Sequence, residues 1–474
     1  MKQDFRIEKI AGVINRSKDS GEELLSQEIM WEGTLKTFKV YKIPLEFLVY
    51  NKYNGRILSS TKSLERQKYF IDVEEPEGKE LIGNLLWQSK PDRNIKTEKS
   101  LRASGQQKVG IITKDGVIID GNRRAMLLNR IDPHGLFKAI VLPVTLEEDP
   151  IQIERLETTY QMGEDEKLGY NPTEKYLKAK QIYDRLEIKH KKEQAIETIS
   201  QWMNEPISEI EKYLETMKVM DEYLEYLDYD GIYTQLDKRE DQFLSLRKWT
   251  NYFYGESSKK AFDGYSNLDV DELKYIAFDY IRIKNEYDGK EFRYLAEGNS
   301  DNHFFGNRDI WNSFKDKHLE ILEILPDEPE PNYDSKSLDN ELIARNKLYY
   351  NKSKLGKNES AFIENLNLHK ERLGNNKATN EPEKLVYKAL QAFETIKTQH
   401  DSFATPEVQK LVQKLGDKVF DSMLDKSTIS TLSHIATLLN SINISDISDE
   451  DYENVKMKCK EIQKICYRFE KALR

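Results

Sequence analysis

The chain has 474 residues, 33% of them charged, and a formal net charge of −10. It is long enough for several domains with buried cores, and its net negative charge excludes a general nucleic-acid coat. No apolar run approaches the roughly 18 residues that a membrane span needs, and the polar start MKQDFRIEK is unlike a signal peptide. We therefore expect a soluble, cytoplasmic protein without a membrane partner.

The charge is distributed unevenly along the chain. Residues 1–130 hold 24 Lys and Arg against 18 Asp and Glu, a net of +6, whereas the remainder carries −16. A phosphate backbone would be repelled by the acidic remainder. A polyanion is therefore expected to bind within the first 130 residues.

Residues 1–37 mix charged and apolar positions with weak periodicity, so we expect an N-terminal extension there. Residues 38–150 have the pattern of a compact α/β domain. We expect its strands at 38–50, where the end could also be a helical turn, and at 109–113, 117–119 and 137–144. Helical periodicity covers 62–89, with a break at 75–78, and 98–103.

One stretch of this domain, Asp115 to Leu128, has the pattern of an anion site. An Asp-Gly turn leads into an apolar strand that ends at Asp120-Gly121, and a helix is expected to begin beside Arg123 and Arg124. Unpaired N–H groups at a helix start, with two guanidinium groups, suit a polyphosphate. The alternative interpretation of this stretch is a surface turn whose arginines form ion pairs with nearby carboxylates.

After Pro150 the pattern is helical almost throughout, so the expected fold class is α+β. A helical domain is expected at 151–230, with helices at 151–160 and 172–190, the second opened by Asn171-Pro172-Thr173-Glu174. A short helix at 193–203, a turn at Asn204-Glu205-Pro206 and a helix opened by a Ser208–Glu211 capping box are expected to follow. That outline is a helix-turn-helix, but an acidic second helix favours a bracing role over DNA reading. We expect a helical extension at 231–324, a polar linker region at 325–381 and a C-terminal bundle of four helices at 382–474.

Two side-chain types were considered as metal ligands. Cys459 and Cys466 lie seven residues apart on one face of an expected helix, which favours packing positions over a disulfide or metal site. The seven histidines are scattered without paired spacing. Neither type predicts a metal centre.

Four boxes, in this order and spacing, resemble those of the ParB/sulfiredoxin-like superfamily. They are Ile43-Pro44 with Asn54-Gly55-Arg56, Leu101 to Gln107, Ile118 to Ala125, and Asn171-Pro172-Thr173-Glu174 within the segment 163–183. The resemblance covers about residues 38–225. It implies a small α/β nucleotide-binding domain followed by a helix-turn-helix-like helical domain.

The resemblance also implies a nucleoside-triphosphate pocket, for CTP or ATP with magnesium. Carried over by position, Gly121, Asn122, Arg123 and Arg124 would hold phosphates, and Asn54, Gly55 and Arg56 would approach from the facing loop. Arginine forks and backbone donors suit phosphates on physical grounds as well. Gln106 and Gln107 would contact the base or ribose, unless they belong to a solvated loop.

This sequence departs from the family pattern at three places. Asn122 stands where the ParB partition proteins have an acid. In the family's magnesium-binding box, Gln161 stands where an arginine is usual. Glu157 of the same box is either a metal ligand or a solvated carboxylate on a helix. No cysteine lies near the arginines, which excludes sulfiredoxin chemistry.

Three functions follow from these observations. The first is a nucleotide-dependent switch that acts on DNA or in a DNA-associated complex of the partition or phage-defence type. The second is an enzyme, either a metal-dependent DNA nuclease or a small-substrate phosphotransferase, with Asp120, Arg123 and Glu157 as the catalytic and metal-binding candidates. The third is a non-catalytic partner-binding protein that forms a homo-oligomer through its C-terminal bundle.

Overall fold

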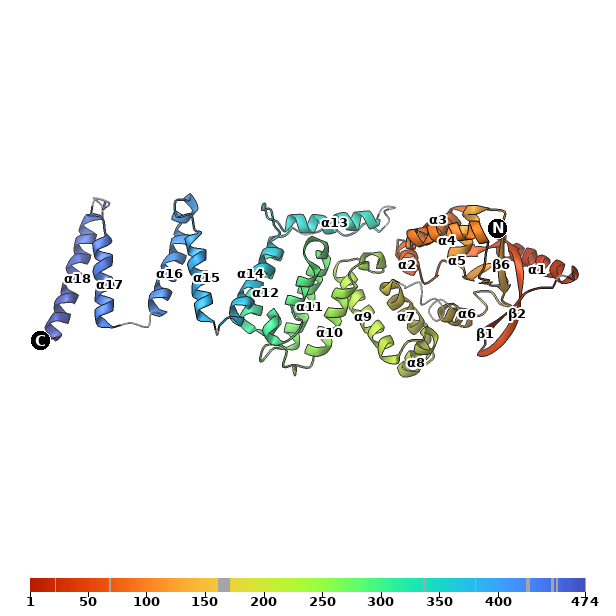
Figure 1. Ribbon diagram of the computed structural model, residues 1–474, viewed down its shortest axis with the longest axis horizontal. Coiled ribbons are helices and arrows are strands. Elements are labelled where there is room, and N and C mark those ends of the chain that lie inside the picture. The colour runs from red at the N-terminus through yellow and green to blue at the C-terminus, as the bar shows by residue number, and fades with distance from the viewer. Residues whose placement is uncertain are drawn as a thin grey trace. The chain divides into compact units, whose positions relative to one another are not determined.

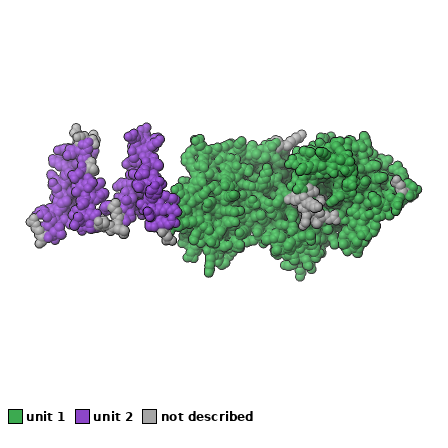
Figure 2. Space-filling model, viewed as in Figure 1, with its two compact units in different colours: residues 1–380 green, residues 381–474 purple. Residues whose placement is uncertain are grey.

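The computed structural model describes residues 1–21, 23–67, 70–160, 171–326, 328–333, 335, 338–379, 381–422, 427–444, 447–448 and 451–473. The chain divides into an N-terminal unit, residues 1–380, and a C-terminal unit, residues 381–474 (Figure 2). Among these residues, none of the helices combines the length and the apolar character that a membrane span requires.

The N-terminal unit begins with a six-stranded mixed sheet in the order β1-β2-β6-β4-β5-β3. Adjacent strands are antiparallel except for the pairs β4–β6 and β3–β5. The strands are β1 (Ser26–Trp31), β2 (Thr34–Pro44), β3 (Val49–Tyr50), β4 (Gly110–Ile112), β5 (Val117–Asp120) and β6 (Leu136–Val141). With the helices that follow, this sheet confirms the predicted α+β class (Figure 1).

The sheet is buried on both faces, as its apolar strands require. Ile112 and Ile118 belong to the core on one face, and Ile111 and Ile119 to the core on the other. The first core is packed by α1 (Gln3–Asp19), α3 (Pro76–Ser89), α4 (Pro91–Ser104) and α5 (Asn122–Ile131), and the second by α6 (Pro150–Thr158). Helix α2 (Leu58–Arg66) follows β3. We call residues 1–149 the α/β region.

Residues 1–37 are part of this region, in contrast to the predicted extension. Strand β1 pairs with β2 along its whole length, and Ile10 of α1 is buried in the core. Arg6 is buried too, and its guanidinium donates to Glu74 at 2.8 Å and to the Asp115 carbonyl at 2.8 Å. Because the buried position 6 is an arginine and not an apolar residue, it interrupts the helical periodicity of residues 1–37.

Helices make up the rest of the N-terminal unit, the helical region of residues 150–379. Their aromatic side chains build one large core, which includes Trp249, Phe304 and Trp311. The helices are α6, α7 (Pro172–Leu186), α8 (Lys192–Met203), α9 (Ile207–Tyr226), α10 (Glu240–Phe253), α11 (Asn267–Arg282), α12 (Arg308–Ile324), α13 (Leu338–Lys352) and α14 (Ala361–Lys377). Short 3-10 helices in the unit are η1 (Leu45–Phe47), η3 (Tyr233–Leu236), η4 (Lys284–Glu286), η5 (Gly289–Tyr294), η6 (Ser300–Asn302) and η7 (Phe304–Gly306).

The helix-turn-helix outline is present as α8 and α9, but its predicted capping box is wrong. Pro206 is the N-cap of α9, and no side chain caps the helix, because Ser208 and Glu211 already lie within it. On its outer side Glu215 accepts from Arg247 of α10 at 2.9 Å and from Asn251 at 2.8 Å. Helix α9 is therefore bonded to α10 on this side.

Residues 338–379 differ from the polar linker that was predicted. Helices α13 and α14 contribute Leu338, Tyr349, Phe362 and Leu366 to the core. Polar positions are buried with them: the Asn365 amide donates to the Phe314 carbonyl at 3.0 Å. These buried polar residues gave the segment its linker-like composition.

The C-terminal unit contains the four predicted helices, with η8 (Asp401–Ala404) after the first. They are α15 (Pro382–Glu394), α16 (Pro406–Ser422), α17 (Thr428–Ser441) and α18 (Tyr452–Ala472). None of the residues described in this unit is buried, and Cys459 and Cys466 are exposed and unpaired. The unit thus has the helices of the predicted bundle without a buried core of its own.

Candidate functional site

Strand β5 passes into α5 at Gly121, as the sequence predicts. Gly121 is the N-cap of α5 with φ 97°, in the left-handed region. A Cβ there would lie 2.9 Å from the Phe137 ring. Both the backbone angle and this close approach require glycine.

Asn122 joins this turn to the facing loop. Its side-chain oxygen accepts from the Asn51 N–H at 2.9 Å, and its amide nitrogen donates to the Ile118 carbonyl at 2.8 Å. An ionised aspartate could make the first bond but not the second, since it has no donor. The Asn122 amide, which departs from the family pattern, therefore links the β5–α5 turn to the loop at Asn51.

The loop that carries Arg56 is held in place by hydrogen bonds to Glu157 of α6. Within the loop, the Asn54 side chain accepts from the Arg56 N–H at 3.2 Å, and Gly55 is buried. The amide groups of Asn51 and Asn54 lie 3.3 and 3.5 Å from Glu157 Oε1. The structure thus brings Asn54, Gly55, Arg56, Asn122 and Glu157 together.

Glu157 takes part in a buried ion-pair cluster. The Lys178 ammonium on α7 lies 3.3 Å from Glu157 and 3.2 Å from Glu154, and all three side chains are almost completely buried. Burial alone would lower the pKa of Lys178, but the two carboxylates raise it above its ordinary value. The described residues contain no group of three or more His, Cys, Asp or Glu that could hold a metal. Gln161 lies outside those residues.

Arg123 lies at the corner between α3 and α4. Its guanidinium donates to the Asn94 side chain at 2.6 and 2.9 Å. Asn94 is buried and donates in turn to the Leu86 and Trp87 carbonyls, at 3.1 and 2.7 Å. Arg123 is thereby held next to the end of α3.

The other predicted site residues lie near the β4 and β6 strands. Arg124 donates to the Lys108 carbonyl at 2.8 Å and lies 3.7 Å from Asp120. The Gln106 amide bonds the backbone of Lys138 in both directions, at 2.8 and 2.7 Å. Gln107 donates to the Ser104 carbonyl. Gln106 is buried, and both its amide nitrogen and its amide oxygen are hydrogen-bonded to the backbone.

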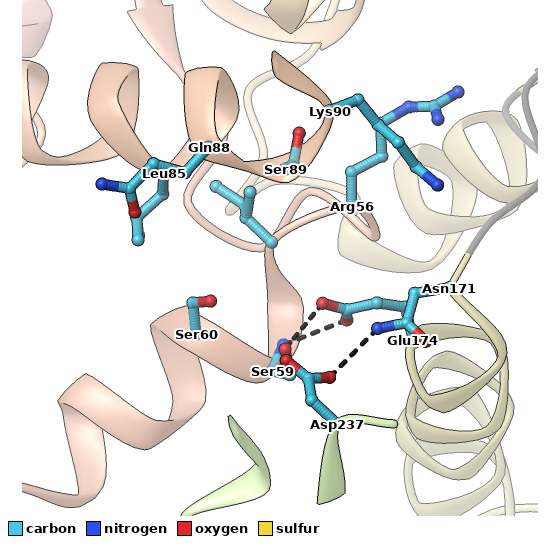
Figure 3. A pocket seen from close by; sticks show the side chains of 11 residues that line it. Arg56, Ser59, Ser60, Leu85, Gln88, Ser89, Lys90, Asn171, Glu174 and Asp237 are labelled. Carbon is cyan, nitrogen blue, oxygen red and sulfur yellow. Dashed lines mark hydrogen bonds between the residues drawn. The ribbon is translucent and has the colours of Figure 1, made fainter. Parts of the chain in front are cut away.

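A cavity of about 270 Å³ opens between the α/β region and the helical region. Figure 3 shows Arg56 and Lys90 on its α/β side, and Asn171, Glu174 and Asp237 on its helical side. Ser89 and Lys90 belong to the α3–α4 corner that Arg123 braces. The remaining lining residues are Ile57, Ser59, Ser60, Leu85 and Gln88.

Glu174 connects the two sides of the cavity. Its carboxylate accepts from the Ser59 N–H at 3.0 Å and from the Ser59 hydroxyl at 2.7 Å, in the first turn of α2. Burial raises its pKa to about 7. Asp237 accepts from the Asn171 amide at 3.1 Å, and burial raises its pKa as well. Protonation of Glu174 near neutral pH therefore removes negative charge from the cavity.

The lining of the cavity combines basic, acidic and neutral hydrogen-bonding groups. Two cations lie on one wall, and serine hydroxyls and amides supply neutral hydrogen-bonding groups. Sequence reasoning missed Lys90 and Asp237, which are far apart in the chain and have no motif. Glu174 was singled out only within the Asn171-Pro172-Thr173-Glu174 stretch at the start of a helix. The sequence did not indicate that its carboxylate bonds Ser59 in the first turn of α2.

Comparison with known proteins adds no relative. No protein-family model matches the chain, and no curated protein or solved structure matches it. The resemblance to the ParB/sulfiredoxin-like superfamily therefore stays a prediction from the residues quoted above.

Proposed function

We propose that the chain binds a nucleoside triphosphate, CTP or ATP with magnesium, in the cavity between its α/β and helical regions. The observation that carries this proposal is the placement of Arg56 and Lys90 on one wall, opposite the helical region. Two cations in a partly enclosed cavity suit a polyphosphate, since they are screened less than surface charges. The volume, about 270 Å³, lies just below the usual range for ligand pockets, so part of the ligand would stay exposed.

Four of the predicted site residues have a distinct part in this proposal. Arg56 contacts the phosphates directly, and Asn122 and Asn54 fix the loop that carries it. Arg123 supports the α3–α4 corner that presents Lys90. Magnesium arrives with the phosphates, because Glu157 is already engaged by Lys178.

The proposed ligand would act as a switch between two arrangements of the regions. It adds contacts to both walls of a cavity that Glu174 already bridges, so it favours the arrangement in which the walls are close. The resemblance suggests that such a switch serves DNA or a DNA-associated complex. Because α9 is acidic and braced by α10, partner proteins are the more suitable readers of the state.

A thermal-shift panel of the four common nucleoside triphosphates with magnesium tests this proposal. A ligand at 100 times its Kd stabilises the folded chain by about 2.7 kcal/mol. We expect one triphosphate to raise the melting temperature of the wild type, and Lys90→Ala, Arg56→Ala and Arg123→Ala to reduce the shift.

The matched control is Arg102→Ala, since Arg102 is a half-exposed α4 cation paired with Glu98. It should respond like the wild type. If no triphosphate raises the melting temperature of the wild type at millimolar concentration, the proposal is contradicted. It is also contradicted if Lys90→Ala shows the same rise in melting temperature as the wild type.

A further inference from the structure

A second groove, of about 390 Å³, lies between α3 and α5 on the α/β region. It shares no lining residue with the first cavity. Tyr50 of β3 and Met126 of α5 supply apolar surface, while Lys79 and Asn84 of α3 and Asn129 and Arg130 of α5 supply polar groups. Its volume is within the usual range for small-molecule sites.

Tyr50 gives the first sign of a ligand. The residue is 4% exposed and lines the groove, yet its hydroxyl has no hydrogen-bond partner among the residues that the structure describes. Burial raises the pKa of Tyr50, so the hydroxyl stays protonated and can donate. The hydroxyl is therefore available to donate a hydrogen bond to a molecule bound in the groove.

The two cations of the groove give the second sign. Across the described part of the chain, neither Lys79 nor Arg130 forms an ion pair. Lys79 donates to the Leu45 carbonyl at 3.3 Å, and Arg130 stacks on the Trp87 ring with its guanidinium 4.2 Å from the centroid. Burial lowers the pKa of Lys79, with a smaller opposing effect from Glu46. Glu80 is the only carboxylate among the groove's lining residues.

We propose that this groove is a binding site for a small phosphate monoester with a planar body, of the size of a nucleoside monophosphate. A phosphate monoester carries nearly two negative charges at neutral pH, which matches the two cations. The Tyr50 hydroxyl donates to it as well. The Met126 side chain and the Tyr50 ring cover the planar body, and the Asn84 and Asn129 amides bond its polar edge.

Isothermal titration of the full-length chain with AMP, CMP and inorganic phosphate tests this site. We expect one nucleoside monophosphate to bind at least ten-fold more tightly than phosphate alone. Arg130→Met keeps the stem that covers Trp87 but removes the charge, and it should weaken binding at least ten-fold.

Gly83→Leu supplies a second variant that fills the groove. A Cβ at Gly83 would lie 3.7 Å from the Tyr50 ring and 4.0 Å from Met126, both ordinary contact distances. The larger side chain should therefore enter the groove and abolish binding, with the circular dichroism spectrum unchanged.

Lys90→Ala is the control that separates this site from the first cavity, and it should bind the monophosphate like the wild type. Three outcomes overturn the inference. They are no binding of either nucleotide at millimolar concentration, unchanged affinity in Arg130→Met, and a loss of affinity in Lys90→Ala instead. Equal affinity for phosphate and the nucleotides overturns the assignment of a planar body.

Discussion

The two units of this chain have similar helical patterns in sequence and opposite burial in structure. In the N-terminal unit, Phe304 and Phe314 are fully buried, and their ring centroids lie 4.8 Å apart. In the C-terminal unit, Phe393 is 41% exposed and Leu415 is 44% exposed, although both lie on apolar helix faces. Periodicity predicts that a helix has a face to bury, but it does not identify what buries it.

The difference is one of energetics as well as geometry. Helices of this length are marginal in water unless an apolar face is packed. The helical region of the N-terminal unit packs its faces on one another, while the C-terminal unit leaves its faces available. Stability should therefore be concentrated in residues 1–380.

The largest expected effect is the loss of a core aromatic. Phe304→Ala removes a ring that packs against Phe314 and His369, and we expect a loss of about 3–5 kcal/mol in the free energy of unfolding. Urea unfolding followed by tryptophan fluorescence measures it, since Trp249 and Trp311 lie in the same core.

The same substitution in the other unit is the matched control. Phe393→Ala should leave that unfolding transition within about 0.5 kcal/mol of the wild type, the range for exposed positions. Equal losses from the two variants would contradict the division into a packed and an unpacked unit.

A somewhat smaller loss is expected from the buried ion-pair cluster. Lys178→Met leaves Glu154 and Glu157 buried without their shared cation and should cost about 3 kcal/mol. Adding Glu157→Gln should recover part of the loss, because one buried negative charge is then removed. Urea unfolding of the single and double variants measures both values.

The exposed pair Lys458–Glu461 in α18, 2.8 Å apart, provides the comparison in the C-terminal unit. Lys458→Met should have no measurable effect on stability, because solvent screens the pair. If Lys178→Met is equally silent, the cluster does not anchor the Arg56 loop.

The parts of the fold predicted from sequence are those that local chemistry determines. The Asp115-Gly116 turn gave the β4–β5 hairpin, with Gly116 at φ 84°, and Asp120-Gly121 gave the passage from strand to helix. Asn171-Pro172 gave the start of α7, where the Asn171 side chain accepts from the Thr173 N–H. Each of these signals lies within a few residues of its effect.

The parts that were not predicted depend on partners distant in sequence. Glu174 bonds Ser59 across 115 positions, and Arg6 bonds Glu74 across 68. A single sequence does not show which polar residues meet, so residues 1–37 were predicted to be an extension. The cavity was missed for the same reason: its two walls come from separate regions of the chain.

An effect of about 1–3 kcal/mol is expected from pH. Burial raises the pKa of Glu174 to about 7, against 4.5 for an ordinary glutamate. Between these values the folded chain keeps a proton that the unfolded chain releases. Stability from this group is therefore complete below about pH 4.5 and is lost as the pH rises to about 7.

Glu174→Gln stays neutral at every pH and still bonds Ser59, so it should be more stable than the wild type at about pH 8 and less dependent on pH. Urea unfolding between about pH 5 and pH 8 measures the slope for both proteins. The exposed Glu407→Gln in α16 should follow the wild-type profile. A wild-type slope retained in Glu174→Gln would mean that another group titrates.

The smallest expected effect concerns the exposed faces of the C-terminal unit. A second copy of the unit would supply matching apolar faces, so we expect the mass from light scattering to rise with protein concentration. Leu415→Ala removes a side chain that is already 44% exposed, and it should weaken this association by about 1 kcal/mol, or about five-fold. Its effect on the unfolding of residues 1–380 should be nil, because that unit has its own core. A chain that stays monomeric at every concentration, with unchanged helicity, would contradict association through the apolar faces of α15 to α18.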